Sequence, residues 1–224
     1  MADDDVTLFG KIKNKLLDSK QKWAEEGRLL TGKTAAHSQR LPPGQRRVEN
    51  WPVLDLGIQP EIPTHAWRLF VDGEVENPVQ LKWGEFTDLP KTALTTDIHC
   101  VTAWSRYDNK WEGVSARTLI ELVKPRADVR HVIFHSYDTY TTNVPLVDFA
   151  ADDVLLAWSW QGEPISREHG GPLRVVIPKL YFWKSAKWIK RVEFSVLDKP
   201  GFWEVRGYHN YGDPWLEQRY DDEE

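Results

Sequence analysis

The chain has one cysteine, Cys100, among 224 residues. A single cysteine cannot form a disulfide within the chain, and it excludes a zinc finger built on cysteine pairs. Long apolar runs are also missing, because no stretch approaches the roughly 20 consecutive apolar residues of a membrane-spanning helix. The sequence therefore predicts a globular protein without an integral membrane segment.

Positive charge is in short supply as well. The chain carries 29 Lys and Arg against 34 Asp and Glu, a formal net charge of −5 at pH 7. This acidic total argues against a general nucleic-acid partner. The first residues show neither the basic and apolar regions of a secretory signal nor a twin arginine. We therefore expect a cytoplasmic protein that does not bind nucleic acid.

Tryptophan, with 12 copies, is the residue type present in excess. Its wide, rigid ring buries a large area and its N–H usually finds one acceptor, so tryptophans build both cores and pockets. With 41% hydrophobic and 28% charged residues, the composition is otherwise that of an ordinary globular chain. The length suits one large domain with an arm.

Residues 1–45 are expected to form that arm. Asp4 or Asp5 can cap a helix that runs to about Glu26, with apolar residues near one face and lysines on the other. A linker follows the helix. Residues 27–34 fit the phosphate-binding pattern G-x-x-x-x-G-K-[ST], but that loop works only between a buried strand and a helix. A charged helix precedes the pattern here, so we expect no nucleotide site.

Residues 46–224 are expected to form the main domain. Alternating apolar residues and turn signals predict one helix at 115–123 and strands at 66–71, 79–81, 92–101, 129–136, 154–160, 172–177 and 187–196. Hairpin turns are predicted at Asp72-Gly73 and Gln161-Gly162. Strands outnumber helices and do not alternate with them, so the predicted fold class is α+β, with mixed, partly barrel-like β-sheets and short helices.

Cys100 ends one of the predicted strands, and the residues alone leave its role open. A lone cysteine in an apolar strand is usually an inert small hydrophobe. His99 and Arg106 place positive charge nearby, which favours the thiolate. A thiolate is a ligand for a soft, redox-active metal. It is also a nucleophile, and pairing with His99, His135 or His169 would give a metal-independent cysteine enzyme.

A second group of functional residues lies between Arg174 and Arg191. This segment has no acid, and its basic residues are Arg174, Lys179, Lys184, Lys187, Lys190 and Arg191. Such a positive field beside glycines and small residues suits an anionic ligand. One alternative is a solvated basic face. Another is an anion or single-stranded nucleic-acid binding module over 174–191, because Trp183 and Trp188 are interleaved with the charges.

Motifs in the C-terminal half carry a family resemblance. Residues 168–178 read Glu-His-Gly-Gly-Pro-Leu-Arg-Val-Val-Ile-Pro, and residues 184–189 read Lys-Ser-Ala-Lys-Trp-Ile. Together with Cys100 upstream and the tail at 203–215, they resemble the molybdopterin-binding oxidoreductase domain of the sulfite oxidase superfamily, over roughly residues 45–220. The chain looks like a cytoplasmic relative of the bacterial protein-methionine-sulfoxide reductase catalytic subunit.

This resemblance implies a molybdenum-molybdopterin cofactor and assigns roles to individual residues. Cys100 is implied as the thiolate ligand of the metal. Trp111 and Tyr208 resemble aromatic residues that line the substrate approach, and with Cys100 and Arg106 they are the candidate catalytic residues. The residues implied to bind the cofactor are Asn50, Cys100, Ser136, His169, Arg174, Ser185, Ala186 and Lys187.

The implied reaction is oxygen-atom transfer on a small sulfur or nitrogen oxo-substrate, of the sulfoxide or sulfite type. Electrons are implied to pass to or from a separate partner protein, because the cofactor carries the hard chemistry and the chain mainly positions it. Sulfite oxidases place an arginine pair shortly after the cysteine, whereas Trp104 and Ser105 stand there in this chain, with Arg106 next. The chain is too short for the further domains of larger relatives, and we expect a monomer.

Overall fold

The computed structural model describes residues 39–221. The helix expected up to Glu26 and the phosphate-loop pattern at 27–34 lie outside the described residues. The division of the chain at residue 45 stays a prediction.

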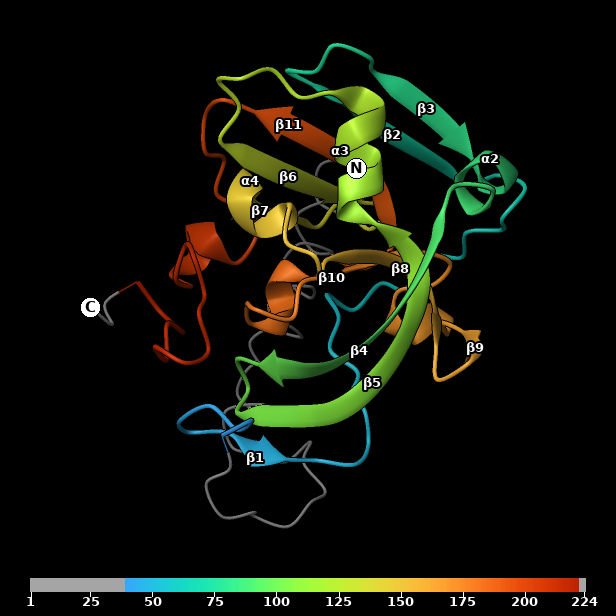
Figure 1. Cartoon of the computed structure of the whole chain (residues 1–224). Coiled ribbons are helices and arrows are strands. Elements are labelled where there is room, and N and C mark those ends of the chain that lie inside the picture. Colours follow the sequence, from blue (N-terminus) through green and yellow to red (C-terminus); the bar gives the residue numbers. More distant parts are fainter. Residues whose placement is uncertain (1–38, 222–224) are drawn as a thin grey trace, which may run out of the picture.

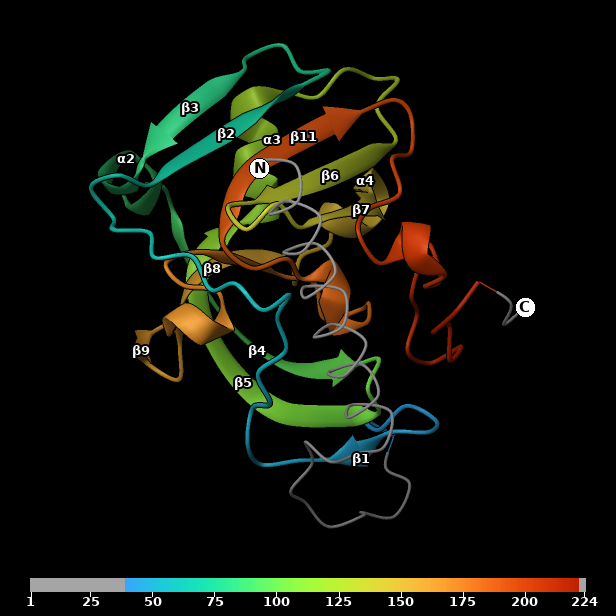
Figure 2. The same cartoon turned by 180° about the vertical axis from the view of Figure 1, so that it is seen from behind.

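Two β-sheets form the framework of the described chain (Figures 1 and 2). The first contains β1 (Arg46–Arg47), β4 (Lys91–Cys100), β5 (Trp104–Ser115), β8 (Leu155–Trp160), β9 (Glu163–Pro164) and β10 (Arg174–Val176). Its order is β1-β5-β8-β10, with β4 paired to β5 and β9 paired to β8. The second sheet has the order β3 (Val79–Lys82), β2 (Arg68–Gly73), β11 (Ile189–Ser195), β6 (His131–Ser136) and β7 (Thr141–Pro145).

Both sheets are mixed, because β1 runs parallel to β5 and β11 runs parallel to β2, while the other pairs are antiparallel. Figure 1 shows β5 curving from β1 at one end of the molecule up to α3 at the other. This long, bent strand joins the two halves of the structure. The predicted mixed sheets are thus confirmed, and their partly barrel-like form stays a prediction.

The helices of the described chain are short. They are α2 (Trp83–Thr87), α3 (Ala116–Val123), α4 (Leu146–Phe149) and the 3-10 turns η1 (Arg167–His169), η2 (Phe182–Lys184) and η3 (Glu204–Arg206). Ser115 caps α3 by accepting a hydrogen bond from the Thr118 backbone N–H, and Lys124 ends it in the left-handed conformation. In Figure 1, α3 and α4 lie against one face of the second sheet.

The main core fills the space under these helices and between the sheets. Leu119 and Val123 of α3, Phe134 of β6, Leu156 of β8 and Val175 of β10 belong to one cluster of fully buried side chains. Burying each such side chain contributes about 1.5–3 kcal/mol relative to exposure. A smaller cluster around Cys100 packs beside the curved part of β5. The site described below lies where this smaller cluster meets β10.

Most predicted elements are confirmed within a few residues, including the helix and the Gln161-Gly162 hairpin turn, in which both residues have positive φ. The turn predicted at Asp72-Gly73 is wrong, because β2 continues to Gly73 and β3 begins only at Val79. Gly73 serves a different purpose, since a Cβ there would lie 2.2 Å from the Phe194 backbone oxygen of β11. Three strands were not predicted, β1, β5 and β7.

Candidate active site

Cys100 is the last residue of β4, and the tight turn to β5 follows it directly. The Ala103 backbone N–H closes this turn by donating to the Cys100 carbonyl over 3.1 Å. The Gln45 side chain donates to the same carbonyl over 3.0 Å. The Thr102 hydroxyl donates to the Cys100 Sγ over 3.2 Å. The thiol is therefore held on a rigid hairpin end rather than on a mobile loop.

Burial dominates the electrostatics of Cys100, whose side chain is 5% exposed. Burial raises the pKa of the Cys100 thiol, and the hydrogen bonds from Thr102 together with the charge of Arg219 oppose that rise only in part. His99 cannot serve as its base, because successive strand residues point to opposite faces. The His99 ring bonds instead to Ser105, and burial lowers the pKa of His99 to about 4. A free cysteine nucleophile has little support in this setting.

Arg174, the first residue of β10, is a buried cation with 1% of its surface exposed. Its guanidinium donates to the backbone oxygens of His169 over 2.7 Å and of Ser185 over 2.8 Å, and it lies 4.1 Å from the Phe182 ring centroid. Burial lowers the pKa of Arg174 to about 9. No carboxylate within residues 39–221 forms an ion pair with it, so its charge lacks a counter-ion from this part of the chain.

The loop after η2 lies beside Arg174. Ser185 accepts a hydrogen bond from the Ile177 backbone N–H over 2.9 Å, which fixes the loop against β10. Lys187 donates to the Glu168 carbonyl over 2.6 Å. Gly170 allows this approach, since it has φ of +107° and a Cβ there would lie 2.8 Å from Lys187 Cβ.

His169 and Trp51 form a stacked pair at one end of the site. Their ring centroids are 3.9 Å apart and the ring planes differ by 4°. Burial, followed by the charges of Arg174, Lys187 and Arg106, lowers the pKa of His169 to about 3. The imidazole is therefore neutral at neutral pH, and it offers one hydrogen-bond donor and one acceptor rather than a positive charge.

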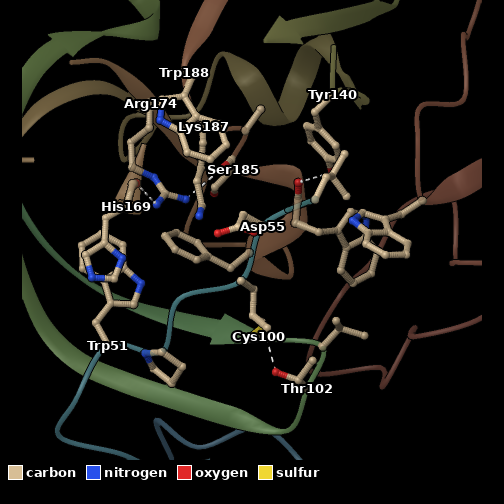
Figure 3. A pocket seen from close by; sticks show the side chains of 18 of the residues that line it. Trp51, Asp55, Cys100, Thr102, Tyr140, His169, Arg174, Ser185, Lys187 and Trp188 are labelled. Atoms are coloured by element: carbon tan, nitrogen blue, oxygen red, sulfur yellow. Dashed lines mark hydrogen bonds between the residues drawn. The ribbon is translucent and has the colours of Figure 1, made fainter. Parts of the chain in front are cut away.

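These groups surround one cavity of about 150 Å³. Figure 3 shows Cys100 and Thr102 on one side of it and Arg174, Ser185 and Lys187 on the other. The lining residues are Trp51, Pro52, Leu54, Asp55, Leu56, Cys100, Val101, Thr102, Trp104, Asp138, Tyr140, His169, Arg174, Phe182, Trp183, Ser185, Ala186, Lys187, Trp188, Trp203 and Tyr208. The thiol and the cations thus face each other across a mostly apolar space.

Seven of the eleven predicted site residues line this cavity. They are Cys100, His169, Arg174, Ser185, Ala186, Lys187 and Tyr208. Segments that are far apart in the sequence meet here, because the β4–β5 hairpin, β10 and the loop after η2 end at the same place. The roles of these residues stay predictions, but their proximity is a property of the fold.

The other four predicted residues lie off the cavity wall. Arg106 donates to the Glu49 carbonyl over 3.1 Å, and Asn50 directly precedes the lining residue Trp51. Trp111 is 2% exposed and packs edge-on against Trp51, with ring centroids 5.3 Å apart.

Ser136 lines a separate hollow of about 330 Å³, whose wall also includes Lys190 and Arg191. Tyr140 lines both this hollow and the first cavity. The hollow that Ser136 lines therefore shares one wall residue, Tyr140, with the cavity that Cys100 lines.

Sequence reasoning missed several lining residues, among them Asp55, Asp138 and Tyr140. Asp138 and Tyr140 lie in the turn between β6 and β7, and β7 was not predicted, so the position of this turn was unknown. The Tyr140 hydroxyl donates to the Trp183 carbonyl over 2.8 Å.

The six basic residues of 174–191 do not form one surface. Lys184 is fully buried and pairs with Glu204 at 2.5 Å, while Lys179 pairs with Asp148 at 2.6 Å. Arg191 of β11 forms an ion pair with Asp72 of β2, over 2.7 Å, within the second sheet. Only Arg174 and Lys187 of the six line the cavity. The interpretation of this segment as a basic binding face therefore has no geometric support.

Comparison with known proteins identifies the type of domain. The family model described as oxidoreductase molybdopterin binding domain matches residues 56–203. The chain belongs to this family, within the sulfite oxidase superfamily. It is thus a molybdenum-dependent oxidoreductase whose cofactor is molybdenum-molybdopterin.

Among the relatives, an uncharacterized oxidoreductase named YuiH from Bacillus subtilis is 45% identical over 195 residues, which cover 86% of this chain and 98% of that protein. The protein-methionine-sulfoxide reductase catalytic subunit MsrP of Campylobacter jejuni is 26% identical, with 66% of this chain and 56% of that protein covered. Sulfite oxidase of Arabidopsis thaliana is 27% identical, with 64% and 45% covered. The chain therefore spans about half the length of these two characterised relatives.

A solved structure shares the fold. The sulfane dehydrogenase SoxCD of Paracoccus pantotrophus matches with a TM-score of 0.59 at 18% identity, over 77% of this chain and 47% of that one. At this identity the likeness concerns the fold alone. No helix among residues 39–221 is both long and apolar enough to cross a bilayer.

The residues at the cavity fit a molybdopterin. Arg174 is a buried cation without a carboxylate partner in the described chain, which is a costly arrangement unless an anion such as the pterin phosphate joins it. No group of three or more His, Cys, Asp or Glu within residues 39–221 could hold a metal ion. Cys100 is a soft side chain on the cavity wall, and its chemistry suits a metal whose other ligands come from a cofactor.

Proposed function

We propose that the protein transfers an oxygen atom to or from a small sulfur or nitrogen oxo-substrate, of the sulfoxide or sulfite type, at a molybdenum that Cys100 ligates. In the reducing direction the substrate loses one oxygen, two electrons and two protons are consumed, and one water forms. The observation that carries the proposal is that Cys100 faces Arg174 and Lys187 across one cavity in a member of this family.

The cofactor supplies the metal at which the oxygen and the electrons are exchanged. The chain holds and orients it. Arg174, Ser185 and Lys187, with the backbone at Ala186, bind the pterin phosphate through charge-assisted hydrogen bonds. His169, neutral and fixed by stacking on Trp51, adds a hydrogen bond without adding charge.

The part of the cavity that is lined by aromatic side chains excludes water and admits substrate. Trp183, Trp203 and Tyr208 form an aromatic cluster on this side, with Trp203 and Tyr208 ring centroids 4.9 Å apart. Tyr208 is 5% exposed and carries the polar group of this cluster, so we assign it contact with the substrate.

Four predicted residues lie off the cavity wall, and in this proposal two of them act through other side chains and two contact the cofactor outside the cavity. The positive charge of Arg106 helps to lower the pKa of His169. Trp111 packs edge-on against the Trp51 ring and holds it in place. Asn50 and Ser136 contact the cofactor only where it extends past the lining residues.

We also infer a separate electron-transfer partner protein, because within residues 39–221 one cavity fits the cofactor and the MsrP relatives bear the name of a catalytic subunit. A monomer in the cytoplasm remains our expectation. The small oxo-substrate reaches the metal from the side of the aromatic cluster.

The direct test starts with protein made in a molybdenum-replete host. We expect close to one molybdenum and one pterin per chain. Turnover would then be screened with sulfite, sulfoxides and N-oxides, using a viologen or ferricyanide dye as the electron source or acceptor. Absence of molybdenum from wild-type protein, in a host with intact cofactor synthesis, contradicts the proposal. Rapid alkylation of Cys100 at neutral pH with metal-free hydrolase activity would favour the cysteine nucleophile instead.

A further inference from the structure

Trp104, the first residue of β5, has a buried polar group without a partner. Its side chain is 2% exposed and lines the cavity. The indole Nε1–H finds no acceptor within the described residues. Leaving a buried donor unpaired destabilises a protein, so such groups need an explanation.

The strand register places this donor near the metal ligand. Trp104 pairs with Cys100 across the β4–β5 hairpin. Residues paired in this way carry their side chains on the same face, with Cβ atoms roughly 4.5–5.5 Å apart. Both side chains also belong to the same small buried cluster. The Trp104 and Cys100 side chains are therefore neighbours on one face of the sheet, and the Trp104 N–H makes no hydrogen bond to the Cys100 sulfur in this structure.

Other tryptophans show that the unpaired N–H is unusual at this site. Trp111, from the same strand and equally buried, donates to the Thr96 hydroxyl over 3.0 Å. Trp188 and Trp183, which also line the cavity, donate to the Arg167 carbonyl over 2.8 Å and to Glu204 over 3.0 Å. Trp67 does have an unpaired N–H, but it lies in the main core and not on the cavity wall.

We propose that Trp104 is a positioning residue for the metal centre, whose Nε1–H donates to an anionic sulfur that is present only when the cofactor is bound. That sulfur is either the Cys100 thiolate or a sulfur of the cofactor, since a metal ligated by Cys100 would bring cofactor sulfur close to this residue. The inference rests on the proposed function. Hydrogen bonds to charged acceptors are about twice as strong as neutral ones, and those to metal-bound sulfur tune the reduction potential.

The proposal makes the effect of removing the N–H depend on cofactor loading. Trp104→Phe loses no hydrogen bond in the cofactor-free protein and one charge-assisted hydrogen bond in the loaded protein. The gain in melting temperature on loading should therefore shrink, and cofactor release should accelerate roughly tenfold. The midpoint potential of the metal should fall, because the thiolate becomes a stronger electron donor when it loses the N–H.

One matched variant serves as the control. Trp67→Phe removes an N–H that is unpaired in the main core, away from the cavity wall. It leaves a similar gap in a core, so the cost of that gap cancels when loaded and cofactor-free forms of the same variant are compared. Trp67→Phe should not change the melting-temperature gain on loading.

The experiment measures molybdenum and pterin content, melting temperature with and without cofactor, and the rate of cofactor release for the wild type, Trp104→Phe and Trp67→Phe. A reduced loading gain in Trp104→Phe alone supports the proposal, whereas equal gains in the two variants overturn it. Absence of cofactor from the wild-type protein contradicts the proposed function instead, so the two failures are distinguishable.

Two further arms complete the test. If Trp104→Phe does not fold, replacing Trp104 with benzothienylalanine keeps the two-ring shape without the N–H, and the same outcomes apply.

Repeating the comparison in a Cys100→Ser background identifies the acceptor. An effect that persists assigns the bond to a cofactor sulfur, and an effect that vanishes assigns it to the Cys100 thiolate. A reduced gain that appears only after addition of a sulfoxide overturns the assignment to the cofactor.

Discussion

The two sides of the cavity differ in charge. The cysteine wall, residues 100–104, is electrically neutral, because burial keeps the Cys100 thiol protonated. The cation wall, Arg174 with 185–187, carries a buried positive charge that contacts backbone carbonyls and aromatic rings and no carboxylate of the described chain. The first wall is stable without a ligand and becomes charged when it ligates a metal. The second is charged already and gains a counter-ion when an anion binds.

Two buried cations of the same segment sharpen this contrast. Lys184 is fully buried and donates to Glu204 at 2.5 Å, as well as to the Asn143 and Asn210 carbonyls. Arg174 is equally buried and has no carboxylate partner in the described chain. Both would count as basic residues in a sequence pattern. The fold makes one a structural ion pair and leaves the other for a ligand.

The largest effect is expected on the cysteine wall. Cys100→Ser removes the soft metal ligand while it keeps the size and the backbone contacts of the residue. Loss of groups that merely support a metal ligand already costs 10–100-fold, so turnover should fall below roughly one hundredth of wild type. Pterin should still bind, because the cation wall is intact. Steady-state rates and pterin content check this, and loss of both together would show that the two walls do not act separately.

The next effect separates the two buried cations. Lys184→Met leaves the Glu204 carboxylate buried and unpaired, so it should lower the free energy of unfolding by about 3–5 kcal/mol with or without cofactor. Arg174→Met should instead reduce cofactor retention at least roughly tenfold and abolish most of the stability gained on loading. Urea unfolding of loaded and cofactor-free protein measures both. Equal behaviour of the two variants would remove the distinction drawn between them.

His169 gives the cation wall a pH dependence. Its pKa is lowered to about 3, from 6.5, so the folded protein binds fewer protons than the unfolded chain between these values. Stability is therefore retained above pH 6.5 and lost as the pH falls toward 3. At pH 5 the loss should approach about 2 kcal/mol before solvent screening reduces it.

His169→Gln keeps a hydrogen-bonding side chain without this titration, so its urea midpoint should fall less between pH 7 and pH 5 than that of the wild type. His99, whose pKa is also lowered by burial, contributes to the remaining slope. Parallel pH profiles for wild type and variant would show that His169 does not titrate as described.

The smallest effect is expected at Lys187. This half-buried side chain keeps contact with solvent, so its attraction to an anion is partly screened. Lys187→Ala should weaken cofactor retention only several-fold, and added salt should reduce the difference from wild type. Lys190→Ala is the control, because Lys190 is exposed and lies off the cavity wall. Equal losses in the two variants would mean that net charge, and not contact, determines retention.

Much of the fold could be predicted because its signals are local. Alternation of apolar residues placed β2, β4, β6, β8, β10 and β11 within a few residues, and Ser115 with Pro125 bounded the helix at 116–123. β5 could not be predicted, because polar residues at 105–110 interrupt its pattern. Its stability comes from pairing with β4 across the hairpin and with β1 and β8, which are distant in sequence.

Some residues of the candidate site could likewise be predicted from the sequence, and others could not. The family motifs at 168–178 and 184–189, with Cys100 and the tail at 203–215, were sufficient to indicate a molybdopterin enzyme and seven of the residues that line the cavity. They did not indicate that Lys184 is paired with Glu204, nor that Asp138 and Tyr140 join the wall.

The sequence by itself thus determined which chemical groups are available: one thiol, a segment without acids, and the local strands and turns that carry them. Only the tertiary structure decided which of these groups face each other. The reason is that strand pairing brings Cys100 and Arg174, 74 positions apart in the chain, to opposite sides of one cavity. Burial then decides which charges are already paired and which donors, such as the Trp104 N–H, are left for a ligand.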